Sequence, residues 1–350
     1  MKKIRVLVVD DSLTVRKRLV EVLGADPELE VVAEADDGKT AIELCQRLRP
    51  DVVTLDMMLP VMTGLAATEY IMAHCPTPIV IVSASTNRGE LFRTYEALAA
   101  GAVDVLEKPT GDEVDDEWER KLVSTVKLVS RIKVITHLRG KLRPAAPPPT
   151  LRPVPGATQA CQVVAIGAST GGPGAIVEIL RGLSPRFPLP ILLVLHIGEP
   201  FAAAFADWLD GTSPLRVAYA RDGEVIPPVG QCRILMAPPD RHMVVRGGKL
   251  RLTSDPERHS CRPSVDELFE SLAREQADRC AGCLLTGMGK DGAAGLLALR
   301  RAGGITIAQD EATSVVFGMP REAILLDAAQ RVLPLGEIAP ALTALAGRKA

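Results

Sequence analysis

Short apolar runs and amphipathic stretches alternate along the first third of the chain. Between the apolar runs, hydrophobic residues recur with helical spacing at Val15–Leu23, Thr40–Leu48, Ala66–His74 and Leu91–Ala100. The apolar runs themselves have the length and β-branched content of strands, and they are Ile4–Val9, Val31–Glu34, Val52–Leu55, Ile79–Val82 and Val103–Leu106. This alternation predicts a doubly wound domain with a parallel sheet covered on both faces. Its ligand site is expected beyond the carboxyl ends of the strands.

A helix and then a proline-rich segment are predicted to follow this domain. The helix is expected over about residues 115–138, with one apolar stripe formed by Trp118, Leu122, Val126, Val129 and Ile132. Six prolines between Lys141 and Gly156 indicate a stiff, partly extended linker. We therefore expect a first domain over 1–120, a helix and linker over 121–160, and a second domain over 161–350.

A second strand–helix pattern begins near Gln162. The predicted strands are Val163–Ile166, Ile191–Leu195, Ile234–Met236, Cys283–Leu285 and Ile305–Ala308. The predicted helices are Pro173–Leu180, Phe201–Leu209, Val265–Arg274, Ala293–Arg301 and Arg321–Leu326. Gly247-Gly248 lies between two apolar runs and predicts a β-hairpin over 243–252. The expected fold class is α/β, with two doubly wound domains: a flavodoxin-like domain followed by a Rossmann-like α/β domain that carries the hairpin.

Composition and charge exclude several classes of protein. A net charge of −2 and 47% apolar residues are typical of a globular chain that does not bind nucleic acid. The apolar run after Lys3 stops at Asp10, too early for a signal peptide, and no run approaches the ~18 residues of a membrane span. Seven scattered cysteines indicate reduced thiols and a cytoplasmic protein. Cys280 and Cys283 form a CxxC pair, which we interpret as core residues.

Carboxylate, hydroxyl and ammonium groups follow the predicted strands of the first domain. Asp10 and Asp11 follow the first strand, Asp56 the third, Ser83 the fourth and Lys108 the fifth. Three carboxylates would then converge at one sheet edge, which is costly unless a hard cation such as Mg²⁺ lies among them. With the metal and Lys108 neutralising phosphoryl oxygens, Asp56 could accept a phosphoryl group.

These residues form a recognisable set. The first domain resembles the receiver domains of bacterial response regulators over roughly residues 3–120, through Asp10-Asp11, Asp56, Pro60, Gly64, Ser83 and Lys108-Pro109. The resemblance implies phosphorylation of Asp56, with Mg²⁺ held by Asp11, Asp56 and the carbonyl of Met58 and assisted by Asp10. It also implies that Ser83 and Lys108 are the switch residues. Receivers often have an aromatic residue three positions before the lysine, where this chain has Val105.

A glycine-rich turn at Gly167–Gly171 opens the second domain and fits the pattern G-x-S-x-G around Ser169. It lies between a predicted strand and a predicted helix, the setting that exposes a nucleophilic serine. The amide groups at the helix N-terminus favour an oxyanion there. A phosphate-binding loop is the rival interpretation, but no G-K-[ST] sequence follows the turn.

A nucleophilic serine needs a base and a group that orients the base. His196 ends the strand after Ser169 and is the candidate base, whereas His74, His137, His242 and His259 are set aside. Asp291 lies in the glycine-rich segment Thr286–Gly292 and is the candidate orienting carboxylate, with helix capping as its alternative role. The chain order Ser, His, Asp differs from the orders in α/β-hydrolases, chymotrypsin and subtilisin, which indicates a separate fold.

The second domain resembles the chemotaxis protein-glutamate methylesterase family, through Gly167–Pro173, Leu195-His196, Arg262–Asp266 and Thr286–Gly292. The resemblance implies hydrolysis of γ-glutamyl methyl esters on cytoplasmic chemoreceptor domains, with release of methanol, and deamidation of receptor glutamines. It implies a chemotaxis histidine kinase as phosphodonor and no cofactor for the ester chemistry. It places Thr170, Gly171 and Met288 at the oxyanion region. The family commonly has histidine where this chain has Cys261.

Two other functions fit parts of the sequence. A phosphorylation-dependent binding module with an inactive second domain would show no ester hydrolysis in any state of Asp56, and the intact set of Ser169, His196 and Asp291 disfavours it. A DNA-binding regulator is disfavoured because the second half has α/β periodicity and not that of a small basic helical domain. For the esterase, we hypothesise that the unphosphorylated receiver blocks the Ser169 cleft and that phosphorylation relieves the block.

Overall fold

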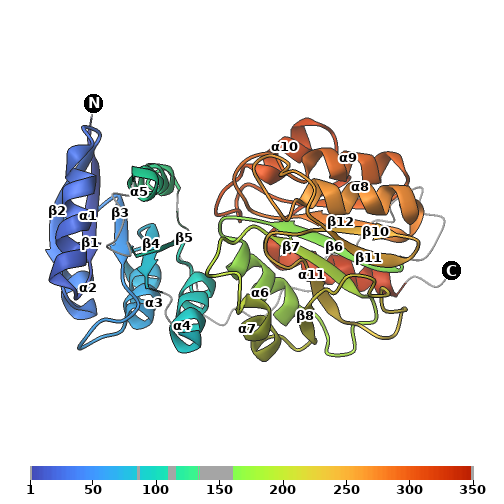
Figure 1. Cartoon of the computed structure of the whole chain (residues 1–350), viewed down its shortest axis with the longest axis horizontal. Coiled ribbons are helices and arrows are strands. Elements are labelled where there is room, and N and C mark those ends of the chain that lie inside the picture. Colours follow the sequence, from blue (N-terminus) through green and yellow to red (C-terminus); the bar gives the residue numbers. More distant parts are fainter. Residues whose placement is uncertain (1, 85–86, 109–115, 133, 135–160, 348–350) are drawn as a thin grey trace. The chain divides into compact units, whose positions relative to one another are not determined.

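The computed structural model describes residues 2–84, 87–108, 116–132, 134 and 161–347. The chain divides into two compact units, residues 1–144 and 145–350, and each is described by itself. The predicted proline-rich linker lies outside the described residues. In both units the main sheet consists of parallel strands, as the strand–helix alternation predicts (Figure 1).

The sheet of the first unit has five strands in the order β2-β1-β3-β4-β5. They are β1 (Ile4–Val9), β2 (Leu29–Ala35), β3 (Val52–Leu55), β4 (Ile79–Ser83) and β5 (Asp104–Glu107). The helices are α1 (Leu13–Ala25), α2 (Gly38–Leu48), α3 (Gly64–His74), α4 (Arg88–Ala99) and α5 (Asp116–Val129). The first four begin at side chains that accept a hydrogen bond from the first turn, namely Ser12, Asp37, Thr63 and Asn87.

Helix α5 is shorter than the predicted helix over 115–138. It ends at Val129, where Arg131 and Ile132 donate backbone hydrogen bonds to carbonyls three residues back. Such bonds tighten and terminate a helix. The predicted apolar stripe is present within these bounds, because Leu122, Val126 and Val129 are fully buried.

The main sheet of the second unit has seven strands in the order β14-β13-β12-β6-β7-β9-β8. They are β6 (Val163–Ala168), β7 (Ile191–Leu195), β8 (Val217–Tyr219), β9 (Ile234–Met236), β12 (Cys280–Leu284), β13 (Ile305–Gln309) and β14 (Arg331–Leu333). The predicted hairpin is confirmed as β10 (His242–Arg246) paired with β11 (Lys249–Thr253). Gly247 and Gly248 have φ of 59° and 72°, the left-handed values that a two-residue hairpin turn requires.

Six α-helices cover this sheet within the described residues. They are α6 (Gly172–Gly182), α7 (Phe205–Thr212), α8 (Val265–Glu275), α9 (Ala293–Arg301), α10 (Met319–Leu325) and α11 (Leu335–Ala346). Helices α8, α9 and α10 pack in a row on one face, and α6 packs with α11 on the other (Figure 1). The predicted helix at Phe201–Leu209 starts four residues late, because residues 201–204 form turns after Pro200.

The strand order places a topological switch point beside β6. The chain runs from β6 to β7 on one side and later returns to β12 on the other side. In the register, Ala168 at the end of β6 pairs with Leu195 of β7, and Gly167 pairs with Leu284 of β12. The carboxyl ends of the three strands are therefore neighbours, at the place where ligand sites form in open α/β sheets.

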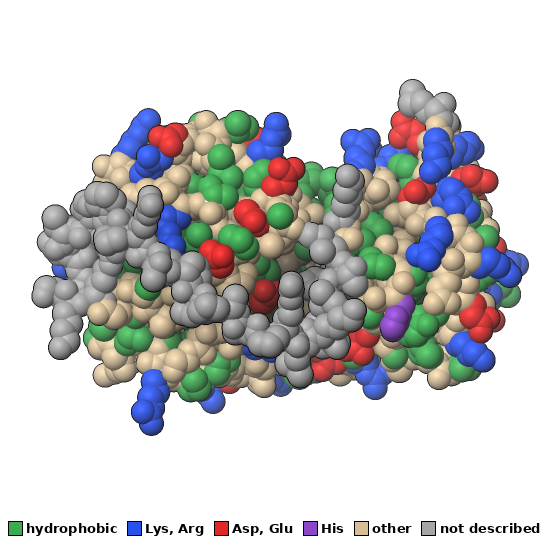
Figure 2. All heavy atoms as spheres, turned by 180° about the vertical axis from the view of Figure 1, so that it is seen from behind, with side chains coloured by type: hydrophobic (Ala, Val, Ile, Leu, Met, Phe, Trp, Pro, Cys, Tyr) green, Lys and Arg blue, Asp and Glu red, His purple; other side chains and the backbone are tan. Residues whose placement is uncertain are grey.

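The surface and the helices agree with the composition. Basic and acidic side chains are scattered among apolar ones over the face in Figure 2, as a net charge of −2 suggests. Among the described helices, none combines the length and the hydropathy needed to cross a bilayer.

Candidate active site and phosphoacceptor site

The first unit brings together the predicted acidic residues. Asp10 and Asp56 are buried and Asp11 is exposed, and one carboxylate oxygen of each lies within 4.8 Å of the others. Lys108 joins the cluster, with its Nζ 2.9 Å from Asp10 Oδ2 and 2.8 Å from Asp56 Oδ2. Met58, the source of the predicted carbonyl ligand, follows Asp56 in the same loop.

The electrostatics of this cluster suit a divalent cation. Burial raises the pKa of Asp10, and the neighbouring Lys108 only partly opposes that shift. Burial acts to lower the pKa of Lys108, but Asp56 and Asp10 outweigh it and raise that pKa. The Ser83 hydroxyl is buried and has no hydrogen-bond partner in the described part of the chain. An all-oxygen donor set beside an unsatisfied hydroxyl fits Mg²⁺ and a phosphoryl group.

In the second unit, Ser169 lies in the turn between β6 and α6. Gly171 adopts a φ of 75° directly before the helix, and the amide of Gly172 donates to the Ser169 carbonyl at 2.6 Å. The amide of Ser169 donates to the carbonyl of Thr286 at 3.0 Å, across from β12. The serine is therefore held at the switch point by backbone bonds on both sides of the turn.

His196 and Asp291 meet at the same edge. His196 Nε2 lies 2.9 Å from Asp291 Oδ2, and the two side chains are 14% and 2% exposed. The amide of His196 donates to Ala168, the residue before Ser169, at 3.0 Å. The alternative role of Asp291 is excluded: helix α9 is capped by Gly292, at a φ of 86°, without a side-chain hydrogen bond.

The pair is electrostatically coupled. Burial acts to lower the pKa of His196, but hydrogen bonds to Asp291 and Cys261 outweigh it and raise the pKa to about 9. Burial acts to raise the pKa of Asp291, but His196, Ser264 and the Val265 amide together lower it. Asp291 is therefore a stable carboxylate that holds the Nε2 proton of His196, which leaves the lone pair of a neutral ring on Nδ1.

Sequence reasoning identified the segment Arg262–Asp266 and a helix from Val265, but it did not predict that the start of this helix holds Asp291. The carboxylate receives hydrogen bonds from Ser264 Oγ at 2.7 Å, Val265 N at 2.7 Å and Asp266 N at 3.1 Å. These groups form the N-terminus of α8, where Ser264 is the N-cap and also accepts from Glu267 N at 3.4 Å. The spacing Ser264-x-x-Glu267 matches the sequence signature of a capping box, and it marks the same helix start that the helical spacing predicts at Val265.

Of the predicted oxyanion residues, Thr170 and Gly171 lie in the Ser169 turn itself, and Met288 lines a nearby pocket beside Asp291. Thr170 precedes Gly171 in the turn, and its carbonyl accepts from Thr286 Oγ1 at 3.0 Å. Met288 is 53% exposed and lines a pocket of about 510 Å³, together with Cys261, Lys290, Asp291 and others. An oxyanion role for these residues stays a prediction.

Comparisons with known proteins agree with the two halves of the chain. Residues 6–115 match the family model described as response regulator receiver domain, and residues 164–342 match that of CheB methylesterase. A protein-glutamate methylesterase/protein-glutamine glutaminase of Anaeromyxobacter dehalogenans is 46% identical over 98% of this chain and 97% of its own length. A protein of the same description from Nitrosospira multiformis is 43% identical over 99% of this chain and 98% of its own length.

A solved structure resembles the second unit. The CheB methylesterase catalytic domain of Thermotoga maritima superposes with a TM-score of 0.50 at 37% identity. The match covers 53% of this chain and all of that domain.

Proposed function

The chain belongs to the CheB methylesterase family, and we propose that Ser169, His196 and Asp291 carry out its ester hydrolysis. The enzyme is a hydrolase of protein γ-glutamyl methyl esters that releases methanol and also converts glutamine to glutamate, and its receiver domain makes it phosphorylation-regulated. The observation that carries the residue assignment is the 2.9 Å contact between His196 and Asp291, beside the turn that holds Ser169.

Each residue has one role in the proposed mechanism. Ser169 Oγ attacks the ester carbonyl carbon while His196 Nδ1 accepts the hydroxyl proton. Asp291 holds the Nε2 proton and stabilises the imidazolium ion that forms. The imidazolium then gives its proton to the leaving methanol, and an acyl-serine remains. Water deprotonated by His196 hydrolyses this ester and restores the serine.

The turn supplies the oxyanion stabilisation in this proposal. The negative oxygen would lie beside the backbone of Thr170 and Gly171, at the N-terminus of α6, with Met288 on the other side. Amide groups at a helix N-terminus favour negative charge, and they need not reorganise during the reaction.

In the first unit, we assign phosphorylation to Asp56. Mg²⁺ would be held by Asp11, Asp56 and the Met58 carbonyl, with Asp10 assisting, and would neutralise phosphoryl oxygens when bound. Lys108 would contact the phosphoryl group from the other side, and the Ser83 hydroxyl would donate a hydrogen bond to one of its oxygens. The buried Ser83 hydroxyl, which has no hydrogen-bond partner among the described residues, supports this assignment.

Partners and boundaries follow from the family. The substrates would be cytoplasmic domains of chemoreceptors, the phosphodonor a chemotaxis histidine kinase, and the location the cytoplasm. The receiver would span 1–120, the helix and linker 121–160, and the catalytic domain 161–350. We retain the hypothesis that the unphosphorylated receiver blocks the Ser169 cleft; deletion of residues 1–140 should then raise esterase activity, and an unchanged or lower activity would reject it.

Methanol release from a methylated receptor fragment tests the proposal. Wild type should release methanol, Ser169→Ala should lose at least about 10³-fold in rate, and a small acyl phosphate with Mg²⁺ should raise the wild-type rate. No methanol release by wild type in either condition would favour a binding module or another ester or amide substrate.

A further inference from the structure

A strained turn precedes α8 and carries Cys261 into the active site. Arg258 and Cys261 exchange backbone hydrogen bonds of 3.2 and 3.0 Å. The two residues between them, His259 and Ser260, have φ of 54° and 57°. Consecutive left-handed residues are the geometry of a type I′ turn, which usually contains Asn or Gly. A His-Ser pair is unfavourable there, so other contacts must fix the turn.

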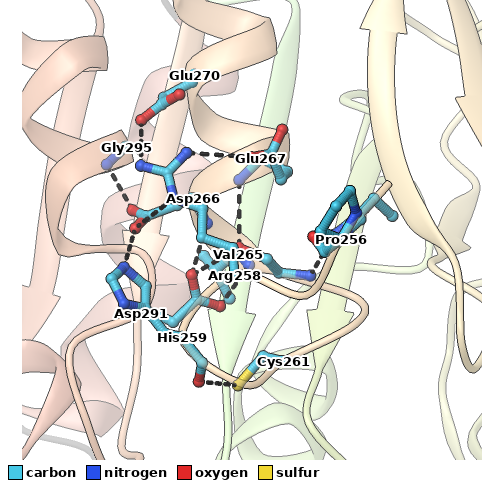
Figure 3. Close-up of polar contacts among 12 residues, drawn as sticks. Pro256, Arg258, His259, Cys261, Val265, Asp266, Glu267, Glu270, Asp291 and Gly295 are labelled. Atoms are coloured by element: carbon cyan, nitrogen blue, oxygen red, sulfur yellow. Dashed lines mark hydrogen bonds and ion pairs between the residues drawn. The ribbon is translucent and has the colours of Figure 1, made fainter. Parts of the chain in front are cut away.

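Acidic residues of α8 provide those contacts (Figure 3). Arg258 contacts three of them, with distances of 3.5 Å to Asp266, 3.1 Å to Glu267 and 2.6 Å to Glu270. His259 Nε2 lies 3.2 Å from the same buried oxygen of Asp266. Arg258 and His259 are therefore both held by α8, the helix whose N-terminus also holds Asp291.

The anchored turn aims a thiol at the base. Cys261 Sγ lies 3.7 Å from Nδ1 of His196, while the other ring nitrogen lies 2.9 Å from Asp291. Cys261, His196 and Asp291 thus form a second nucleophile–base–carboxylate array that shares its base with Ser169. The Cys261 thiol also donates a weak hydrogen bond to the His259 carbonyl within the turn, at 3.4 Å.

Small solutes can reach this thiol. Cys261 is partly exposed and lines the pocket of about 510 Å³ described above. Of the other six cysteines, five are buried, and Cys232 alone is partly exposed. Burial raises the pKa of the Cys232 thiol to about 11 and no ring nitrogen activates it among the contacts of the described residues. Cys232 is therefore a matched control for exposure without activation.

The chemistry of the array makes the thiol reactive. A neutral His196 has its free lone pair on Nδ1 and can accept the thiol proton, which leaves a thiolate beside an imidazolium ion. Thiolates, and not thiols, are the nucleophiles in oxidation and alkylation.

We propose that Cys261 is a base-activated thiol whose oxidation by a peroxide switches the hydrolase off. The sulfur attacks one oxygen of hydrogen peroxide, the O–O bond breaks, and an S–O bond forms. The thiol loses two electrons and becomes a sulfenic acid, while the other oxygen leaves as water with the proton from His196. The sulfenic acid then occupies Nδ1, the nitrogen that Ser169 needs. Two equivalents of a thiol reductant restore the thiol and yield a disulfide of the reductant and water.

Labelling of the full chain tests the reactivity without any reference to catalysis. Iodoacetamide alkylation, followed by mass spectrometry of each cysteine, should modify Cys261 at least roughly ten times faster than Cys232. His196→Ala should slow alkylation at Cys261 by a similar factor and leave Cys232 unchanged. Equal rates at the two cysteines, or no effect of His196→Ala, would overturn the proposal.

A second experiment measures inhibition of methanol release by peroxide, and it rests on the proposed function. Hydrogen peroxide should lower wild-type methanol release at least roughly tenfold, and dithiothreitol should restore it. Cys261→Ser should keep most of its own untreated rate after peroxide, whereas Cys232→Ser should be as sensitive as wild type.

If Cys261→Ser is itself inactive, a measurement on wild type alone still tests the proposal. Residual activity should fall in proportion to the fraction of Cys261 that mass spectrometry finds oxidised; inhibition without oxidation of Cys261 rejects the proposal. If wild type releases no methanol at all, the proposed function fails, and the labelling experiment still decides the reactivity of Cys261.

Discussion

His196 Nε2 lies 2.9 Å from Asp291 Oδ2, so one ring nitrogen is committed to the carboxylate, while the other, Nδ1, lies 3.7 Å from Cys261 Sγ. The carboxylate is itself fixed by three donors from the start of α8. The orientation of the His196 ring therefore depends on a helix that is remote from it in sequence. The contact with Asp291 should also determine how ester hydrolysis and stability depend on pH.

The first prediction concerns that pH dependence. The pKa of His196 is raised from 6.5 to about 9, so kcat/KM for ester hydrolysis should rise with pH through about 9 as the ring becomes neutral. Because the folded-state pKa is raised, the pair stabilises the fold fully below pH 6.5, and this contribution is lost as pH rises towards about 9. pH profiles of kcat/KM and of thermal unfolding check both statements.

The variant Asp291→Asn tests the contribution of the carboxylate charge to the site. It should lower the pKa seen in kcat/KM and reduce kcat by about 10²- to 10⁴-fold, because the ring loses its counter-charge and its tautomer. A mutant profile that superimposes on the wild-type profile would contradict the assigned pair.

The second prediction concerns Ser264, which caps α8 and donates to Asp291 at 2.7 Å. Ser264→Ala should lower kcat by roughly tenfold with KM unchanged, because the carboxylate loses a donor but substrate contacts remain. It should also lower the free energy of unfolding by about 1 kcal/mol, as loss of an N-cap does.

Thr63→Ala is the control for the capping effect, since Thr63 caps α3 in the other unit. It should have a similar cost in stability and no effect on basal methanol release. If both variants keep wild-type kcat, Ser264 acts on the helix alone and does not position Asp291.

The sequence predicted the parts of the fold that have strong periodicity. Strands β7 and β9 and helix α9 have the predicted bounds, because each is a clear apolar run or stripe between turn residues. Strands β8 and β14 were not predicted, since each has three residues, too few to show a period. Helix α11 was also missed; Pro340 within it interrupts the helical signal.

The positions of Ser169 and His196 could be predicted from the sequence, whereas those of Ser264 and Cys261 could not. Ser169 and His196 follow adjacent parallel strands, so strand order alone brings them to one edge. Ser264 and Cys261 reach the site through a turn and a helix end whose geometry depends on tertiary contacts with Asp266 and Asp291. No local pattern encodes such contacts, although the capping box marks where the helix begins.

The third prediction concerns Gly287, which packs against Ser169, the proposed nucleophile. A Cβ at this position would lie 2.3 Å from Met319 Sδ and 2.7 Å from Ser169 Cβ. The methionine end can move, but the serine Cβ can move only with its turn. Gly287→Ala should therefore lower kcat by roughly 10²-fold through displacement of Ser169.

Gly198→Ala is the matched control, because a Cβ at Gly198 would meet nothing within 4 Å. This variant should keep kcat within about twofold of wild type. Circular dichroism and thermal unfolding show whether Gly287→Ala remains folded; a folded variant with wild-type kcat would mean that Ser169 tolerates the shift.

The last prediction concerns the receiver, where Lys108 Nζ contacts Asp10 and Asp56 at 2.9 and 2.8 Å. Phosphoryl uptake from a small acyl phosphate should need Mg²⁺ and should vanish in Asp56→Asn, while Ser169→Ala should keep it. Asp11→Asn should raise the Mg²⁺ concentration for half-maximal uptake roughly tenfold, because a carboxylate ligand is lost. Asp36→Asn is the control, an exposed acid that follows β2 at the same sheet edge. Chelation by EDTA should stop phosphoryl uptake and leave basal methanol release unchanged, since the proposed mechanism of Ser169, His196 and Asp291 uses no metal. A parallel loss of both activities would instead place a metal in the ester chemistry.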